Sequence, residues 1–101
     1  MLDPASVRLQ FDGEVVYWRG PSPYHYVPVP PDGAELLHMV APVATYGWGV
    51  IPVTVTIGNT TFATSLFPKD GGYLVPVKDA VRRAERIELG DSVAIELTIR
   101  T

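Results

Sequence analysis

The fold is decided by one stretch of the sequence, VIPVTVTIGNTTFATSLF at residues 50–67. Apolar and polar residues alternate on both sides of Gly58-Asn59, a pair that favours a two-residue hairpin turn. We therefore predict two antiparallel strands in which Ile57 lies opposite Thr60. Because successive side chains of a strand point to opposite faces, this register gathers one apolar face, made of Ile51, Val53, Val55, Ile57, Phe62 and Leu66. Pro52 has no backbone N–H, so we expect a sheet edge or a bulge at that point.

Shorter alternating runs flank this hairpin. They predict strands near residues 6–19, 24–29, 73–75 and 93–99. Gly13 interrupts the first run and is expected to mark a bulge or a bend. Pro28 suits only a strand end or an edge, and Asp70-Gly71-Gly72 predicts another tight turn.

Two short helices are expected between these strands. Asp32 and Glu35 have the spacing of a capping box, with Asp32 at the N-cap, and Pro42 is expected to end this helix near residue 41. A second helix is predicted over residues 77–89, with Gly90 as the left-handed residue after its end. Its apolar stripe would consist of Val77, Ala80, Val81, Ala84 and Ile87.

The resulting fold class is mainly β, a β-rich α+β arrangement of about six strands and two short helices. The strands follow one another too closely for parallel crossovers other than across the helices. A small closed β-barrel leaves no unpaired edges and is the arrangement we expect, with an open sheet covered by helices as the alternative. A chain of 101 residues, 47% apolar and 19% charged, is expected to form one domain over residues 1–101.

The composition excludes several classes of site. The chain has no cysteine, which rules out a thiol nucleophile, a disulfide framework, thiolate zinc sites and iron–sulfur clusters. Its formal net charge of −3 argues against non-specific nucleic-acid binding, which needs an excess of Lys and Arg. Residues 1–10 lack the pattern of a signal peptide, and no run of apolar residues is long enough to span a membrane. We therefore expect a cytoplasmic protein without membrane partners.

A search for catalytic chemistry finds no recognisable motif. None of the four serines lies in a G-x-S-x-G elbow, and His25 and His38 have no second ligand at helical or hairpin spacing. The sequence lacks a phosphate-binding glycine loop, and Gly47-Trp48-Gly49 precedes a strand instead of following one. We therefore predict no catalytic residue, no metal site and no cofactor, in a protein that is not an enzyme.

An aromatic group is the first candidate ligand site. His25 lies between two tyrosines, and an aromatic group with one titratable member suits a small-ligand pocket. Since aromatic residues are favoured in strands, an ordinary aromatic barrel lining or surface is the alternative. The candidate residues are Trp18, Tyr24, His25, Tyr26 and Trp48.

A second candidate site is basic and belongs to the second predicted helix. Lys78, Arg82 and Arg86 recur every four positions and would form a ridge that suits an acidic partner or phosphate groups. Arg83 is expected to pair with Asp79, which lies four residues before it. Because acidic residues are interleaved with these cations, an ordinary salt-bridged surface is the alternative.

Six segments of the chain resemble, in order, a known family. They are YHYVPVP at 24–30, IPVTVTIG at 51–58, TSLFP at 64–68, YLVPVK at 73–78, AVR at 80–82 and GDSV at 90–93. Together they are similar to the prokaryotic family of domains of unknown function numbered nineteen-oh-five. The resemblance implies a double-split β-barrel, related in architecture to the swapped barrels of AbrB and MazE. It implies no established activity, ligand or catalytic residue.

Three functions remain open on the sequence. The leading hypothesis is a non-catalytic binding or interaction module for a small molecule or a protein partner. The alternative is a regulatory DNA-binding protein, by analogy with AbrB-like barrels, although the acidic net charge argues against nucleic acid. An unrecognised enzyme is the third.

Overall fold

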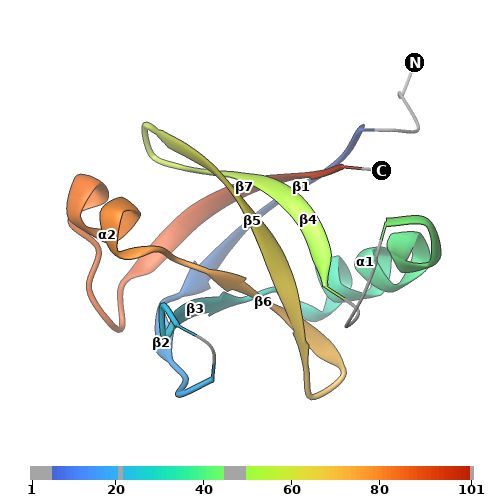
Figure 1. Ribbon diagram of the computed structural model, residues 1–101, viewed down its shortest axis with the longest axis horizontal. Helices are drawn as coiled ribbons and strands as arrows, with labels where there is room; N and C mark the ends of the chain where they lie inside the picture. The colour runs from blue at the N-terminus through green and yellow to red at the C-terminus, as the bar shows by residue number, and fades with distance from the viewer. Residues whose placement is uncertain (1–5, 21, 45–49, 101) are drawn as a thin grey trace.

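The computed structural model describes residues 6–20, 22–44 and 50–100, and this part of the chain contains seven strands and two helices (Figure 1). The strands are β1 (Ser6–Glu14), β2 (Val16–Tyr17), β3 (His25–Pro28), β4 (Ile51–Ile57), β5 (Thr60–Lys69), β6 (Gly72–Pro76) and β7 (Ser92–Arg100). The helices are α1 (Pro31–Ala44) and α2 (Asp79–Glu85).

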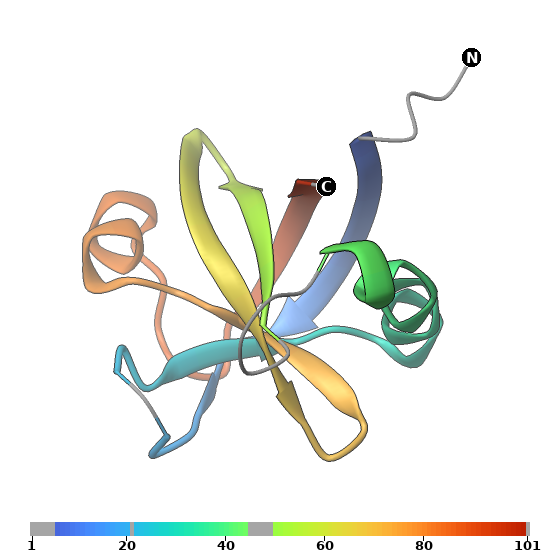
Figure 2. The same cartoon turned by 45° about the vertical axis from the view of Figure 1, so that its right-hand side comes forward.

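The seven strands form one antiparallel sheet in the order β1-β7-β4-β5-β6-β3-β2. β5 belongs to both halves of the sheet, because its first seven residues pair with β4 and its last three pair with β6. The sheet curls into a half-barrel, with α1 and α2 on opposite sides of it (Figure 2). The expected mainly β fold with two helices is therefore confirmed, whereas closure of a six-stranded barrel is not.

The described part of the chain has seven strands, one more than predicted, because the first predicted strand is interrupted at Val15. The Val15 N–H donates to the carbonyl of Asp91 at 2.9 Å, and the Gly90 N–H donates to the carbonyl of Val15 at 2.8 Å. Val15 thus pairs with the turn before β7, and the single strand predicted over residues 6–19 becomes β1 and β2. A bulge or bend was expected at Gly13 instead, but Gly13 stays in the ladder opposite Val93.

The central hairpin has the predicted register, with Ile57 opposite Thr60. Gly58 has a φ of 59° and is the turn residue that adopts a positive φ, which is the pattern of a type II′ turn. Pro52 pairs with β5 alone, because the ladder between β4 and β7 begins at Val53. The expected edge position of Pro52 is confirmed, and the missing N–H leaves no gap in the ladder with β7.

The other predicted strands are present with small shifts at their ends. Pro28 is the last residue of β3, as expected for a proline in a strand. Asp70 and Gly71 have φ values of 52° and 80°, so the turn into β6 is of type I′. β7 spans the predicted closing strand and extends it at both ends.

The predicted capping box of α1 is wrong by two residues, and the predicted end of the helix is wrong by about three. The helix begins at Pro31, whose fixed φ suits the first helical position, so Asp32 lies inside the first turn. α1 passes through Pro42 and continues to Ala44. Because Pro42 lies in the last turn, its missing N–H removes one helical hydrogen bond without interrupting a further turn.

The predicted helix over residues 77–89 is wrong in length, since α2 is shorter at both ends. Val77 stays extended and donates its N–H to the carbonyl of His25 at 2.9 Å, so the helix starts after Lys78. It ends at Arg86, which has a φ of 54° and is the left-handed residue after the helix; Gly90 also has a positive φ, of 88°, but does not follow the helix directly. Of the predicted stripe, Ala80 and Ala84 are exposed, while the buried members are Val77, Val81 and Ile87. In the described part of the chain, neither helix is long and apolar enough to cross a membrane.

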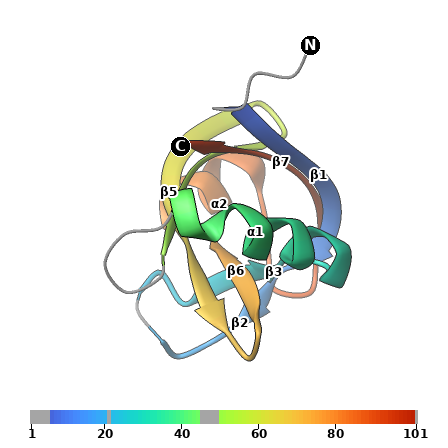
Figure 3. The same ribbon diagram turned by 90° about the vertical axis from the view of Figure 1, so that its right-hand side faces the viewer.

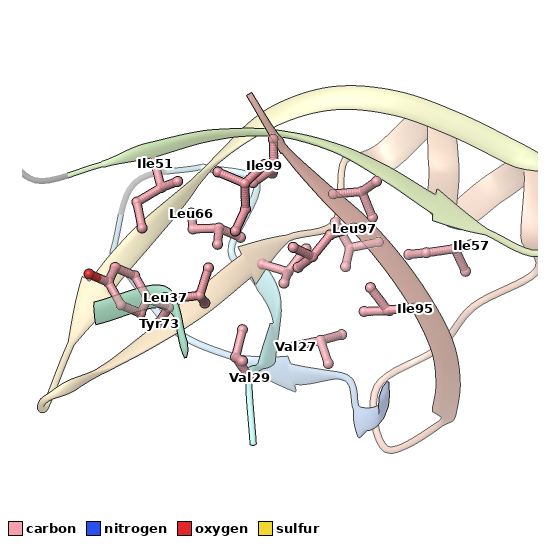
Figure 4. Packing of buried hydrophobic residues seen from close by; sticks show 14 of the residues in the cluster. Val27, Val29, Leu37, Ile51, Ile57, Leu66, Tyr73, Ile95, Leu97 and Ile99 are labelled. Carbon is pink, nitrogen blue, oxygen red and sulfur yellow. The ribbon is translucent and has the colours of Figure 1, made fainter. Parts of the chain in front are cut away.

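The core lies within the curve of the sheet, where residues of β4, β5, β6 and β7 meet Leu37 of α1 (Figure 4). The predicted apolar face of the hairpin is buried, except for Phe62, which is half-buried. Both faces of β6 are covered, so this strand is buried from Tyr73 onward and holds the start of α2 against the sheet.

Candidate functional site

The outer face of the β2–β3 pair carries an aromatic group. Tyr17 lies opposite His25 in the ladder, and their rings meet edge to face with centroids 6.2 Å apart. Tyr24, with a φ of 71°, brings its ring to 6.2 Å from that of Tyr17. Tyr17 and Tyr24 are both exposed, so these two side chains lie at the surface of the protein.

The inner face of the same strands carries a second aromatic group. The rings of Trp18 and Tyr26 are 5.2 Å apart, and Phe67 meets Tyr26 edge to face at 6.4 Å. Tyr26 is 0% exposed, and burial raises the pKa of its phenol. Lys69 places its Nζ 5.3 Å from the centroid of Trp18, a cation–π contact. A groove of about 440 Å³ lies beside Trp18 and Lys69, bordered by Pro28.

The structure does not gather the five predicted ligand residues in one pocket. Trp18 borders this groove, Tyr24 is exposed, and Tyr26 lies buried beneath Trp18. His25 points to the opposite face from Tyr26, because neighbouring side chains of a strand alternate. Trp48 lies outside the described residues.

A second groove, of about 420 Å³, lies where the chain enters α2, and we call it the α2 groove. The hydrogen bond from Val77 to the carbonyl of His25 holds the start of α2 beside β3. Phe67 and Pro76 supply apolar wall, while Ser65 supplies a half-buried hydroxyl. The remaining lining residues are Ser22, Pro23, Thr64, Lys78 and Asp79.

Asp79 is the carboxylate of the α2 groove, and it forms an ion pair with Arg82. Arg82 donates from Nη2 to Asp79 Oδ1 at 2.7 Å, and this hydrogen bond holds the pKa of Asp79 below its usual value. Desolvation by burial opposes this effect and is second to it in size, while electrostatic interaction with Arg82, Arg83 and His25 lowers the pKa further. The predicted ion pair is therefore corrected: Asp79 contacts Arg82, three residues on, in place of Arg83.

Lys78 does not continue a basic ridge along the helix. It precedes the first helical residue in an extended conformation, and its Nζ donates to the carbonyl of Ala63 on β5 at 2.8 Å. The same Nζ lies 6.0 Å from the centroid of Phe62. Arg86 closes the other end of α2 in the left-handed conformation, so the four predicted cations do not share one helical face.

The structure joins the two groups that the sequence kept apart. His25 belongs to the predicted aromatic site, and Arg82 and Arg83 belong to the predicted basic site. All three interact electrostatically with Asp79, which lines the α2 groove beside Lys78. Sequence reasoning missed the hydroxyl groups of Ser22, Thr64 and Ser65, which come together only through tertiary packing. No spacing signal could have found them, since β5 and α2 are far apart in the chain.

Glu85 is a further residue whose role was missed. Glu85 is half-buried and accepts a hydrogen bond from the Thr60 hydroxyl. His38 similarly ties α1 to the β5–β6 turn, where its Nε2–H donates to the carbonyl of Gly71 at 2.8 Å. Among the described residues, no three His, Asp or Glu side chains are close enough to hold a metal ion.

A comparison with family models gives one match, over residues 11–97, to the family described as Domain of unknown function (DUF1905). No curated protein matches the chain. The match spans most of the sequence and agrees with the resemblance seen in its segments, whereas the architectural relation to AbrB and MazE stays a prediction. The chain therefore belongs to the DUF1905 family of domains of unknown function.

Proposed function

We propose that the protein is a non-catalytic binding module and that its ligand is a small molecule with an anionic group, bound in the α2 groove. One observation carries the proposal: Lys78 lines this groove together with Asp79, and the charge of Asp79 is already paired with Arg82. The local charge is thus positive, although the chain as a whole carries a net charge of −3. A concave site of one charge sign concentrates ligands of the other sign.

The lining of the α2 groove supports a small ligand. Its volume of about 420 Å³ falls within the range of pockets that bind small molecules. Phe67 and Pro76 offer apolar contact, and a few hydroxyl groups beside them can fix an orientation. An ammonium group has three N–H donors, and Lys78 uses one of them on Ala63, so others are free to meet an anion.

The non-catalytic part of the proposal rests on the residues of the groove and on the sequence. The chain has no cysteine, and its serines lie in no nucleophile motif. His25 Nδ1 lies 3.4 Å from the carbonyl of Pro23, and its ring packs against Tyr17. A role in holding the shape of the β2–β3 hairpin accounts for both contacts. Arg82 is paired with Asp79, Lys78 lies before the helix and Arg86 ends it, so these cations do not form the extended row that duplex phosphates require, and we do not propose DNA binding.

The test is a ligand-observed NMR screen of small carboxylates and phosphate monoesters, followed by calorimetry on the hits. Lys78→Gln is expected to weaken a hit about tenfold or more, because a charge-assisted hydrogen bond is lost. Lys69→Gln is the matched control, since Lys69 lies at the other groove, over Trp18. The proposal fails if no anionic compound binds, or if the Lys69 variant weakens binding as much as the Lys78 variant.

A further inference from the structure

β1 has a long edge that no strand of the described chain covers. It is the first strand of the sheet and pairs with β7 alone (Figure 3). The strand at the other end, β2, has two residues, whereas β1 has nine. Short edge strands protect a sheet from pairing with another chain, whereas the unpaired N–H and C=O groups of a long edge strand can form hydrogen bonds with a further strand.

The free part of this edge ends before Gly13. A Cβ added at Gly13 would run into Val27 Cγ1 and would lie 3.4 Å from the carbonyl oxygen of Pro28, so β3 packs closely against β1 at that end and leaves less room there for a further strand. Residues 7–12 remain. Arg8, Gln10 and Asp12 are exposed on one face of this segment, while Leu9 and Phe11 on the other face are half-buried against the core.

Neither charge on this edge lies directly opposite a charged residue in its own sheet. On β7, Arg8 faces Thr98 and Asp12 faces Ala94. Neither Arg8 nor Asp12 forms an ion pair with any residue that the structure describes. An arginine and an aspartate are thus placed at an open edge, four residues apart and on the same face.

We propose that β1 pairs in antiparallel fashion with β1 of a second copy of this chain, about a two-fold axis at Gln10. This register places Arg8 of each copy opposite Asp12 of the other and places Leu9 opposite Phe11. A two-fold contact repeats each pair, so two ion pairs and two apolar pairs form at once. A register centred on Leu9 places Arg8 against Gln10, and one centred on Phe11 needs Glu14, beyond the part against which β3 packs.

Gln10, at the axis, is already held away from its counterpart. Its Nε2 donates to Glu96 Oε2 at 2.8 Å, which draws the side chain toward β7. The two Gln10 residues can therefore face each other without their side chains competing for the same space. The proposed dimer uses a surface on β1 and is independent of the ligand proposed for the α2 groove.

Sedimentation equilibrium tests the proposal on the full chain, from about 5 to about 500 µM, where weak dimers of this kind become populated. The unaltered protein is expected to shift from monomer to dimer over this range. Arg8→Asp and Asp12→Arg are each expected to raise the dimer Kd about tenfold or more, because like charges then face each other twice. The double variant Arg8→Asp/Asp12→Arg exchanges the charges, so it is expected to regain the original Kd within about threefold.

Arg19→Asp is the matched control, since Arg19 is exposed, lies outside β1 and undergoes the same change of charge. Arg8→Gln and Asp12→Asn give milder versions of the single changes that keep the strand polar. The proposal is overturned if the unaltered protein stays monomeric throughout. It is equally overturned if a dimer forms that the single changes leave intact, that the double exchange does not restore, or that Arg19→Asp weakens as much as Arg8→Asp.

Discussion

Glu85 Oε2 accepts a hydrogen bond from the Thr60 hydroxyl at 2.5 Å, which ties the last residue of α2 to the first residue of β5. Both side chains are half-buried, so water competes only partly for the bond. Glu85→Ala is expected to lower the free energy of unfolding by about 1 to 2 kcal/mol, because a hydrogen bond to a charged group is lost. Urea denaturation followed by circular dichroism measures this loss. Glu88→Ala is the control: Glu88 is exposed, and its replacement should change stability by no more than about 0.5 kcal/mol. Equal losses in the two variants would contradict a specific role for Glu85.

Gly58 lies beside the Glu85 carboxylate. We therefore expect an alanine to destabilise the protein more at Gly58 than at Gly71, another turn glycine. Gly58 and Gly71 both have positive φ, at 59° and 80°. A Cβ at Gly58 would run into the Glu85 carboxylate, whereas a Cβ at Gly71 meets nothing within 4 Å. Gly58→Ala is therefore expected to cost more than Gly71→Ala, which carries only the backbone strain of about 1 to 2 kcal/mol. Thermal unfolding compares the two. The clash with Glu85 is not the cause if Gly71→Ala is the more destabilising of the two changes. It is also not the cause if the difference in stability between the two variants stays the same when Glu85→Ala is added to both.

Gly13 predicts a clash between β1 and β3, which pack against each other without pairing in the sheet. The Cβ of Gly13→Ala would meet Val27 Cγ1 in the core, and forcing one methyl group into a packed site costs about 1 to 3 kcal/mol. Val27→Ala should be destabilising alone but should make the Gly13 change less costly, which a double-mutant cycle measures. Gly72→Ala serves as the control, because the nearest atom to its Cβ lies at an ordinary 3.8 Å. Additive effects of the Gly13 and Val27 changes would refute the contact.

The hydrogen bond from Arg82 predicts a pH-dependent contribution from Asp79. The pKa of Asp79 is lower in the folded protein than its ordinary value of 3.8. Its charge therefore stabilises the folded state above that value, and this contribution is lost as the pH falls through the folded-state pKa. Asp79→Asn is expected to be less stable than the unaltered protein near neutral pH, with a difference that shrinks as the pH falls below 3.8. Urea denaturation at a series of pH values provides the measurement. If the difference in stability between the two proteins is the same at every pH, the charge of Asp79 does not stabilise the folded state.

The parts of the fold that sequence could predict are those in which neighbours in the chain are neighbours in space. The β4–β5 hairpin was predicted to the residue, because alternation and Gly58-Asn59 together fix its register. The break at Val15 could not be predicted, since its hydrogen-bond partners lie at residues 90 and 91. Val77 also fits the apolar stripe of a helix, but in the structure it is extended and donates its N–H to the carbonyl of His25, which is distant in the sequence.

The candidate site was predictable in its residue types but not in its arrangement. Lys78 and Arg82 have helical spacing, yet Lys78 lies before the helix and contacts Ala63 on β5. Tyr26 was grouped with His25, but strand alternation sends the two side chains to opposite faces. Residue types thus indicated charge and aromatic surface, while the location of the α2 groove required the tertiary contacts.

The ladder between β1 and β7 places Ser6 opposite Arg100, so the first and last described residues of the chain are neighbours. A linker of a few residues could join these ends, and the exposed Asp70-Gly71 turn could then be opened to give new termini. In such a circular permutant, β7 would lead directly into β1. The pairing of β1 with β7, whose residues are the farthest apart in the present sequence, would become a local hairpin. Because folding rates rise as contacts become more local, the permutant is expected to fold faster than the parent while keeping the same sheet.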